Sequence, residues 1–475
     1  MLAVVRTGEG EGETMSKDSE SQRRSGTGRP QPISRRHFLR RTALTSLGCM
    51  VALHESAARG RATGSQPVEV AVDFAAPVPG VPSMSGILHG LNATAPPDEI
   101  IAPLQPNLWR VGQSRPLSLY DRVVGFGARF VLVLSDPWGY HSPWPYEDFA
   151  RWEDFVGQMA QAAQGLDVIW DVWNEPNASV FWQGTPGQFF ETYGRAYNVL
   201  RDSLGPDALI SGPSLNQYDR NFLAAFLDSC VTNGCEVNAL SWHELVGSGS
   251  RIYPIADHLA EAYTLFLENP AYSVLNIQEV HINEVIGPLD QYRPGEILGS
   301  FYYLEVGGAS GACKACWRAS DGTSNCNNIS LDGLIVPGTA QVRAGWWAYK
   351  LYADGVPTRV QSASSDRHVA ALASSNSAAD DTAQVLLAYY DAGSSPPVVA
   401  VDVGLYNLRS LPFLQTAESV AVSLSRIPDT GEAELTEPLP AGELIVPIGD
   451  DGSAGVPIPA INLHEAMVLS ISAAE

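Results

Sequence analysis

The stretch VIWDVWNEPN, residues 168–177, closes an apolar run with an aromatic ring, an amide, an acid and a proline. A run this apolar is typical of a strand that is buried on both faces of a parallel sheet. A strand of that kind would carry Asn174 and Glu175 at its C-terminal end. Both the fold and the chemistry therefore depend on what the rest of the chain places beside the Glu175 carboxylate.

Strand-like apolar runs alternate with amphipathic helical segments between residues 85 and 354. The expected strands are Gly86–Leu91, Asn107–Gly112, Ala128–Ser135, Asp167–Asn174, Ala208–Gly212, Val237–His243, Ser273–Glu284 and Gly311–Trp317. The expected helices are Tyr146–Gln164, Thr185–Leu204, Asp219–Thr232, Ile255–Leu267, Ile297–Val306 and Thr339–Tyr352. Eight such units over about 270 residues predict an α/β fold, a (β/α)8 TIM barrel. A doubly wound open sheet is the alternative, but no Gly-rich phosphate loop follows the first strand.

The pattern changes at about residue 355, where short alternating segments are separated by Ser, Gly, Pro and Asp clusters. The clearest of these segments are Gln384–Tyr390, Val398–Leu405, Ser419–Leu424 and Ala466–Ile471. This spacing predicts a C-terminal β-sandwich domain over residues 355–475. Residues 63–84 hold one more alternating segment, Val68–Phe74, which we expect to join that sandwich. The barrel is expected to span residues 85–354.

The first 62 residues are rich in Arg, Ser and Gly and show no apolar periodicity. Residues 34–40 read SRRHFLR, and a weakly apolar segment and small residues follow at 43–58. This order resembles a twin-arginine export signal, with cleavage expected between Ala58 and Thr63. The resemblance implies export to the periplasm or the outside by the twin-arginine machinery, with Met1 or Met15 as the start. Cys49 offers a weaker match to a lipid-attachment site.

Charge and hydropathy exclude several classes of partner. The first 62 residues hold 11 of the 29 basic and 6 of the 52 acidic side chains, so the remainder carries a net charge of −28. Such a surface repels nucleic acid and anionic membranes and disfavours a strongly anionic polymer as substrate. No apolar stretch of about 18 residues is present, so membrane insertion is not expected.

Five cysteines follow the export segment, and export permits disulfides. Two short-range pairings are open, Cys230 with Cys235 and Cys316 with Cys326. Cys313 and Cys316 also form one half of a zinc-binding pattern, but no second CxxC or His pair completes it. One thiol is left without an assigned partner.

Two carboxylates stand at the ends of expected barrel strands, where TIM-barrel active sites lie. Glu175 ends the fourth strand, and Glu284 ends the seventh in the order Ile282, Asn283, Glu284. Glycoside hydrolysis needs such a pair, one protonated acid for the leaving oxygen and one carboxylate for the anomeric carbon. Glu279 is the rival for the second position, but it lies further from the strand end and is expected to face the opposite way.

The run WNEPNASVFWQGTPGQFFETYGRAY, residues 173–197, resembles the clan A retaining glycoside hydrolases and most of all glycoside hydrolase family 39. The resemblance implies a TIM barrel with an added β-sandwich. It implies Glu175 as acid/base, Glu284 as nucleophile and Asn174 as the partner of the sugar 2-hydroxyl. His243 matches a histidine beside the nucleophile, and Trp317 matches the aromatic platform under the sugar. Val285 departs from the pattern, which often has an aromatic residue there.

Other strand ends fit a sugar site. Arg110 could hydrogen-bond the nucleophile and keep it ionised, or could form a plain structural salt bridge. His89 and Asn92 close the first strand, and Trp138 and Trp182 lie in loops that could line further subsites or simply pack. Each histidine could equally be a core residue whose hydrogen bonds are satisfied.

The sequence thus predicts an exported retaining glycosidase that acts on a β-linked oligo- or polysaccharide and needs no metal or organic cofactor. We expect the charge of Glu284 to contribute to a raised pKa of Glu175. A catalytically inactive carbohydrate-binding protein on the same barrel is the main alternative. An exported barrel with another, non-hydrolytic activity is a third. No Gly-x-Ser-x-Gly or His-Glu-x-x-His motif points to an esterase or a zinc protease.

Overall fold

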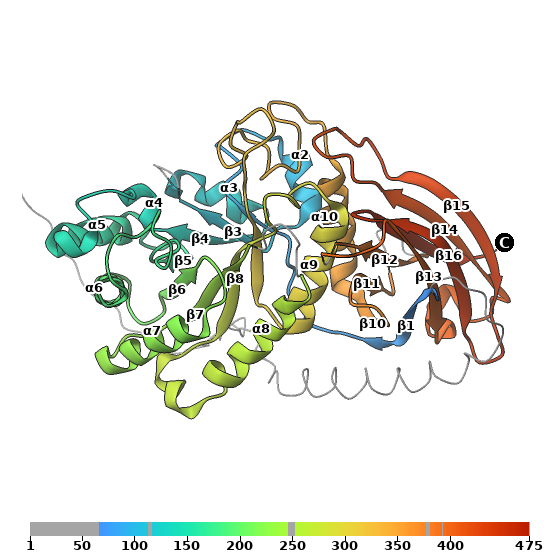
Figure 1. Cartoon of the computed structure of the whole chain (residues 1–475), viewed down its shortest axis with the longest axis horizontal. Coiled ribbons are helices and arrows are strands. Elements are labelled where there is room, and N and C mark those ends of the chain that lie inside the picture. The colour runs from blue at the N-terminus through green and yellow to red at the C-terminus, as the bar shows by residue number, and fades with distance from the viewer. Residues whose placement is uncertain (1–65, 113–115, 246–251, 377–380, 392, 475) are drawn as a thin grey trace, which may run out of the picture. The chain divides into compact units, whose positions relative to one another are not determined.

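A computed structural model describes residues 66–112, 116–245, 252–376, 381–391 and 393–474 (Figure 1). The expected export signal, the alternative starts Met1 and Met15, and Cys49 lie outside the described residues. No helix in the part of the chain that the structure describes is long and apolar enough to cross a membrane.

The expected barrel is present as eight parallel strands that close on themselves in chain order. Their bounds are β2 Gly86–Leu88, β3 Leu108–Val111, β4 Arg129–Val133, β5 Val168–Asp171, β6 Leu209–Leu215, β7 Ala239–Glu244, β8 Glu279–Val285 and β9 Gly311–Lys314. Most of their residues are buried, because side chains fill the barrel and helices cover its outside. The prediction of a TIM barrel is confirmed.

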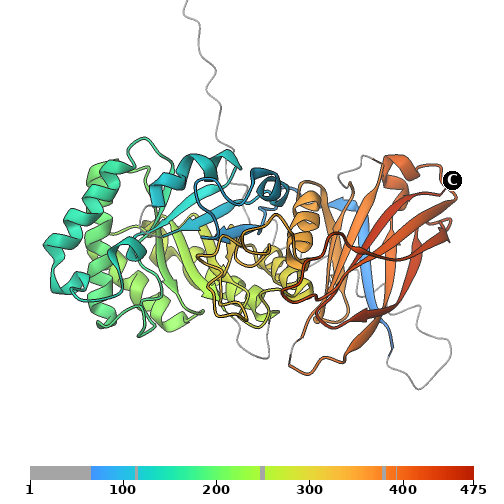
Figure 2. The same ribbon diagram turned by 90° about the horizontal axis from the view of Figure 1, so that it is seen from above.

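Helices follow the strands and cover the barrel, as Figures 1 and 2 show for α5 to α8. The α-helices are α2 Asp98–Ile101, α3 Tyr120–Gly125, α4 Ser135–Trp138, α5 Phe149–Ala162, α6 Pro186–Leu204, α7 Arg220–Asn233, α8 Pro254–Ala262, α9 Pro294–Gly307 and α10 Ala344–Gly355. Helix α6 begins where the sequence indicates, because Pro186 occupies its first turn. Thr185 and Gln188 form a capping box around it.

Several expected elements have other bounds in the structure; the last barrel strand, for example, ends at Lys314, so Trp317 lies in the loop after it. Two expected elements also change in kind. The apolar run Ser273–Glu284 does not form one strand, since Pro270–Leu275 is a 3-10 helix and β8 begins only at Glu279. Asn276 has a left-handed backbone with φ of 53°, which ends the helical turn and re-aims the chain. Helix α8 is shorter than expected, because Tyr263–Leu267 continue it as a π-helical turn.

The C-terminal strands form one nine-stranded sheet in the order β15-β14-β17-β12-β11-β10-β1-β13-β16. The bounds are β1 Val68–Pro77, β10 Arg359–Ser364, β11 Val369–Ser374, β12 Ala383–Tyr389, β13 Val398–Tyr406, β14 Ser419–Ile427, β15 Leu439–Pro447, β16 Ala454–Asn462 and β17 Ala466–Ala473. The end strands β15 and β16 contact each other, so the sheet curls around its own apolar core and is sandwich-like. Strand β1 lies inside it, antiparallel to β10 and parallel to β13.

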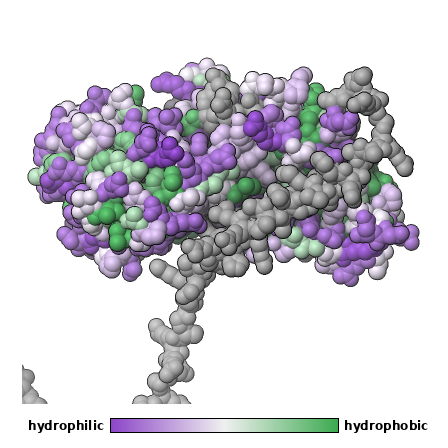
Figure 3. All heavy atoms as spheres, turned by 60° about the horizontal axis from the view of Figure 1, so that its bottom comes forward, coloured by the Kyte–Doolittle hydropathy of each residue, from purple (hydrophilic) through white to green (hydrophobic). Residues whose placement is uncertain are grey.

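The face in Figure 3 is mostly hydrophilic, with apolar side chains scattered in small groups. This agrees with the acidic composition of the chain.

One disulfide closes the loop after β9, between Cys316 and Cys326. Of the two short-range pairings that the sequence left open, this is the one that forms. Cys230 and Cys235 are buried free thiols, so the alternative disulfide between them does not form in this structure. Cys313, the odd thiol, is also free and is fully buried in the barrel interior. Because Cys316 is oxidised, Cys313 and Cys316 do not form half of a thiolate metal site.

Helix α9 packs against the sheet through glycines one turn apart. A Cβ on Gly295 would lie 2.3 Å from the Tyr389 carbonyl oxygen, and one on Gly299 would lie 2.7 Å from the ring of Tyr390. The Gly295 amide also donates to the His464 carbonyl at 2.9 Å. The barrel and the sheet therefore meet through backbone, and no side chain larger than hydrogen fits at Gly295.

We predict that Gly295→Ala lowers the free energy of unfolding by about 1–3 kcal/mol, because the added methyl group overpacks a seam whose obstacle is backbone. The midpoint of thermal or urea unfolding measures this. Gly125→Ala is the matched control, since nothing lies within 4 Å of its Cβ position. That change should alter stability by less than about 1 kcal/mol. Equal effects of the two substitutions would contradict the packing argument.

Candidate active site

The carboxylate of Glu175 reaches the barrel mouth through a strained turn after β5. Glu175 has a positive φ of 48°, and its amide donates to the carbonyl of Ser214, which itself has φ of 53°. Left-handed backbone is uncommon outside glycine and concentrates at functional sites. The side chain of Glu175 is 9% exposed. The turn thus places the carboxyl group of Glu175, at the end of a core strand, so that it faces a nearly closed site.

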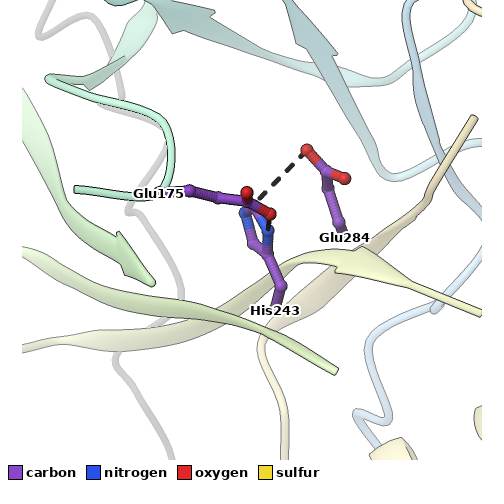
Figure 4. Close-up of side chains that lie close together, drawn as sticks. All are labelled: Glu175, His243 and Glu284. Atoms are coloured by element: carbon purple, nitrogen blue, oxygen red, sulfur yellow. Dashed lines mark hydrogen bonds and ion pairs between the residues drawn. The ribbon is translucent and has the colours of Figure 1, made fainter. Parts of the chain in front are cut away.

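Glu284 reaches the same place from β8 (Figure 4). The pairing of β7 with β8 shifts register after Trp242, so that His243 lies opposite Glu284 instead of Asn283. Such a shift re-aims side chains at a strand end. The side chain of Glu284 is 14% exposed, so it also faces the barrel mouth.

His243 stands between the two carboxylates and is fully buried (Figure 4). Its Nδ1 lies 2.9 Å from Oε1 of Glu175, and its Nε2 lies 3.9 Å from Oε1 of Glu284. One ligand-type atom from each of these three residues lies within 4.8 Å of the other two. The histidine that the sequence placed beside the nucleophile therefore also contacts the predicted acid.

Arg110, at the end of β3, holds these elements together. Its Nε donates to Asp171 at 2.8 Å, its Nη1 to Glu284 at 2.8 Å, and its Nη2 to the Asn174 side-chain oxygen at 2.9 Å. The guanidinium is buried, and the charges of Asp171 and Glu284 raise its pKa despite the opposing effect of burial. The sequence suggested two alternative roles for Arg110. The structure shows a contact of each kind, one to the predicted nucleophile Glu284 and one structural salt bridge to Asp171.

Asp171 is the partner that sequence reasoning missed. It is fully buried and accepts hydrogen bonds from Ser214 Oγ at 2.7 Å and Asn283 Nδ2 at 3.1 Å, besides that from Arg110. A charge in such a place needs this full set of partners. A signal was present, because Asp171 is the one charged residue of β5, whose other residues are apolar.

Three pKa shifts describe the electrostatics. Burial raises the pKa of Glu175 above its ordinary value, against the opposing charge of Arg110. Burial also raises the pKa of Glu284, with His243 and Arg110 opposing it and the Glu175 charge adding to it. Burial lowers the pKa of His243 to about 4, so this imidazole is neutral near pH 7. Arg110 binds Glu284 directly, so of the two carboxyl groups Glu284 has the closer cationic partner for its ionised form. Burial is thus the main cause of the raised pKa of Glu175.

His89 forms a second polar group at the mouth, with a residue that the sequence did not single out. Its Nε2 lies 3.5 Å from the Asp136 carboxylate, which also accepts a hydrogen bond from Tyr140. The Gly112 amide lies 3.4 Å from Nδ1 of His89, which favours a proton on Nε2. A Cβ on Gly112 would lie 1.7 Å from Asp136, so only glycine admits this carboxylate. His89 and Asp136 can donate to and accept from a hydroxyl group.

Trp317 lies in the disulfide-closed loop after β9 and is half-buried. Its indole nitrogen donates to the carbonyl oxygen of Ile286 at 2.9 Å. Ile286 is two residues beyond Glu284, so this contact places Trp317 beside the end of the strand that carries Glu284. The position suits the predicted platform.

Three other predicted binding residues have structural partners. The Asn92 side-chain oxygen accepts from the amides of Thr94 and Ala95 and so closes its own loop. Trp182 is 4% exposed and packs edge-on against Trp173 and other rings. Trp138 packs against Trp152 and Phe155. We therefore do not assign a sugar subsite to Asn92, Trp138 or Trp182.

Glu279 is not part of the site. It accepts from Arg129 at 2.7 Å and lies 2.7 Å from Nε2 of His281, at the opposite end of β8. Burial opposes ionisation there, but His281 and Arg129 lower the pKa of Glu279 to about 2. It is a structural ion pair, as its distance from the strand end suggested.

The cluster of Glu175, His243 and Glu284 has the donor types of a metal site. Arg110, however, already occupies Oε1 of Glu284, and a second positive charge beside the guanidinium would be repelled. The arrangement therefore suits proton transfer and nucleophilic attack better than metal binding.

Comparison with known proteins agrees with the fold. No protein-family model and no curated protein sequence matches the chain. Among solved structures, N2152 from Neocallimastix frontalis has a TM-score of 0.70 at 21% identity, over 86% of this chain and 100% of that one. A glucosidase from Croceicoccus marinus has a TM-score of 0.62 at 16% identity, over 87% and 100%. A GH39 enzyme from Xanthomonas axonopodis pv. citri has a TM-score of 0.59 at 13% identity, over 89% and 100%.

At these identities the likeness shows the fold. The predicted resemblance to clan A glycoside hydrolase structures, family 39 among them, is confirmed at that level.

We predict that Asp171→Asn lowers the free energy of unfolding by about 3–5 kcal/mol, because it leaves a buried guanidinium short of one counter-charge. Unfolding midpoints measure the loss. Asp98→Asn is the control, since Asp98 pairs with Arg122 but its side chain is 70% exposed. An exposed pair of this kind contributes about 1 kcal/mol or less. A small effect of Asp171→Asn would show that Arg110 does not depend on this partner.

Proposed function

We propose that this protein is an exported retaining glycoside hydrolase that cleaves O-glycosidic bonds, with Glu284 as nucleophile and Glu175 as acid/base. The observation that carries the proposal is the carboxylate pair across the barrel mouth. One oxygen of each residue lies within 4.8 Å of the other. Retaining glycosidases hold their two carboxyl groups about 5–5.5 Å apart, whereas inverting enzymes separate them by about 6.5–9.5 Å. The short separation supports the retaining mechanism.

In the first step the Glu284 carboxylate attacks the anomeric carbon, and the bond from that carbon to the leaving oxygen breaks. Arg110 keeps Glu284 ionised through the hydrogen bond at 2.8 Å. Glu175 gives its proton to the leaving oxygen, for which the raised pKa of this carboxyl is suited. The products of the step are the free alcohol and a covalent glycosyl ester of Glu284.

In the second step Glu175, now ionised, takes a proton from water while the water oxygen attacks the anomeric carbon. The Glu284 carboxylate leaves, and the sugar keeps its original anomeric configuration. His243 contacts Glu175 through Nδ1 in the resting structure. A neutral imidazole that donates at this position stabilises the carboxylate that the first step leaves on Glu175, and so favours the transfer of its proton to the leaving oxygen.

The polar groups of the site suit a sugar. Asn174 is held by Arg110 beside the nucleophile, where the sugar 2-hydroxyl is expected. His89 and Asp136 offer a donor and an acceptor for a further hydroxyl, and Trp317 offers a flat ring for the C–H face. Two structural neighbours are named as a glucosidase and a GH39 enzyme, which supports a glycosidic substrate. A β-linked oligo- or polysaccharide remains our proposal.

We predict that Glu284→Ala abolishes hydrolysis of aryl β-glycosides and that Glu175→Ala lowers kcat/KM about 10²–10⁴-fold for substrates with poor leaving groups. Azide, a nucleophile that needs no general base, should restore turnover of Glu175→Ala with an activated aryl glycoside. NMR should show that the anomeric configuration is retained. Initial rates over a panel of aryl glycosides provide the measurement.

Glu279→Gln is the matched control, because Glu279 lies on the same strand but outside the site, and it should keep kcat and KM within about twofold. The pH profile gives a second readout. The alkaline limb of kcat/KM should lie above the ordinary glutamate pKa of about 4.3 and disappear in Glu175→Gln. Sugar binding without turnover in the wild-type protein would instead favour the inactive carbohydrate-binding alternative.

We also propose export by the twin-arginine pathway, on the strength of the SRRHFLR motif at residues 34–40. Replacement of Arg35 and Arg36 by lysine together should retain the protein in the cytoplasm of a bacterial host, because the pathway reads the arginine pair. Fractionation followed by immunoblotting measures this. Export of the double variant at the wild-type level would count against the pathway.

A further inference from the structure

The connection between β14 and β15 (residues 428–438) extends from the sheet to the loops that follow β8 and β9, as Figures 1 and 2 show. Leu435 of this connection is buried in an apolar cluster that includes residues of both the barrel and the sheet. Its amide donates to the Val342 carbonyl at 2.8 Å, and its carbonyl accepts from the Trp347 indole at 2.7 Å. The Arg343 guanidinium donates to the Glu432 carbonyl at 2.9 Å. The connection is therefore fixed to the barrel at several points.

The side chain of Glu432 makes a different contact, with the disulfide loop (residues 316–326). Its Oε1 accepts from the Ser320 amide at 2.6 Å, and its Oε2 accepts from the Ser320 hydroxyl at 3.0 Å. Hydrogen bonds to a carboxylate are stronger than those between neutral groups. Both carboxylate oxygens are thus engaged by one residue of a loop that belongs to the barrel.

The disulfide loop carries Trp317. The Cys316–Cys326 bond closes it, and the Asn325 amide donates to the Trp317 carbonyl at 2.9 Å. On one side the fully buried Asn325 donates to Gln291, in the connection after β8. On the other side the loop is held at Ser320 by Glu432. Trp317 precedes both attachments in the chain, three residues before Ser320, and its indole nitrogen donates to the Ile286 carbonyl oxygen.

We propose that Glu432 of the sheet is a positioning residue for sugar binding, which fixes the Trp317 ring through Ser320. This inference rests on the proposed function, because it takes Trp317 as the sugar platform. A platform that moves loses contact area with the sugar in the ground state and the transition state alike. Such a loss raises KM and leaves kcat nearly unchanged.

The test compares Glu432→Ala, Glu432→Gln and Glu434→Ala in the full chain. Glu432→Ala should raise KM for an aryl glycoside about three- to tenfold, with kcat within about twofold. Glu432→Gln should restore most of the affinity, because its amide can accept from the Ser320 amide and donate to the Ser320 hydroxyl. Glu434 lies two residues away with an exposed side chain, so Glu434→Ala should match the wild type.

Hydrogen exchange of residues 316–326, followed by mass spectrometry, provides a readout that does not depend on activity. Exchange of this segment should rise in Glu432→Ala and stay at the wild-type level in Glu432→Gln and Glu434→Ala. Unchanged exchange in Glu432→Ala, or faster exchange without a rise in KM, would overturn the positioning role while wild-type hydrolysis persists. A wild-type protein that hydrolyses no glycoside would instead contradict the proposed function, and the exchange data would still report whether Glu432 holds the loop.

Discussion

The buried guanidinium of Arg110 is the constraint on which the rest of the site depends. It donates hydrogen bonds to Asp171 on β5, to Glu284 on β8 and to Asn174 in the turn after β5, at distances of 2.8–2.9 Å. A buried charge is tolerated only when its partners are complete and well placed. The position of Glu284 is therefore fixed by a group whose positive charge also opposes the rise in the pKa of Glu284 that burial causes. One interaction thus bears on both the geometry and the protonation of this carboxyl group.

The backbone accommodates that constraint with two local irregularities. The register shift between β7 and β8 aligns His243 with Glu284, and the left-handed residues Glu175 and Ser214 bring the acid inward. Each costs free energy that a regular strand would not, and the surrounding packing stabilises both. Through these two irregularities, strands that otherwise belong to the core bring the carboxylates of Glu175 and Glu284 within a few ångströms of each other at the barrel mouth.

The sequence was sufficient for the features that depend on periodicity and strand ends. The barrel, the helix start at Pro186 and the placement of Glu175, Glu284 and Arg110 at one mouth all follow from such local patterns. Partners across the barrel could not be predicted, because no local pattern encodes them. Asp136, on α4, becomes a mouth residue only because Gly112, the residue after β3, leaves room for it. Trp182 has the composition of a sugar platform, but its neighbours bury it in an aromatic cluster.

The same difference between local patterns and contacts of distant segments applies to the C-terminal sheet. Alternation identified five of its nine strands, namely β1, β12, β13, β14 and β17. The contacts between the sheet and the barrel could not be predicted, since those of residues 428–438 join segments about 100 residues apart. Leu435 belongs to a buried apolar cluster that the barrel and the sheet share, and the backbone of Gly295 lies directly against the sheet. Seams made of backbone and buried apolar groups resist sliding, because interiors are close-packed and any shift opens voids or clashes. A loop such as 316–326 can then be held from both sides without large entropy cost at binding, since it is ordered before the ligand arrives. In the proposed role of Glu432, the connection between β14 and β15 contributes to sugar binding because it holds this loop at Ser320.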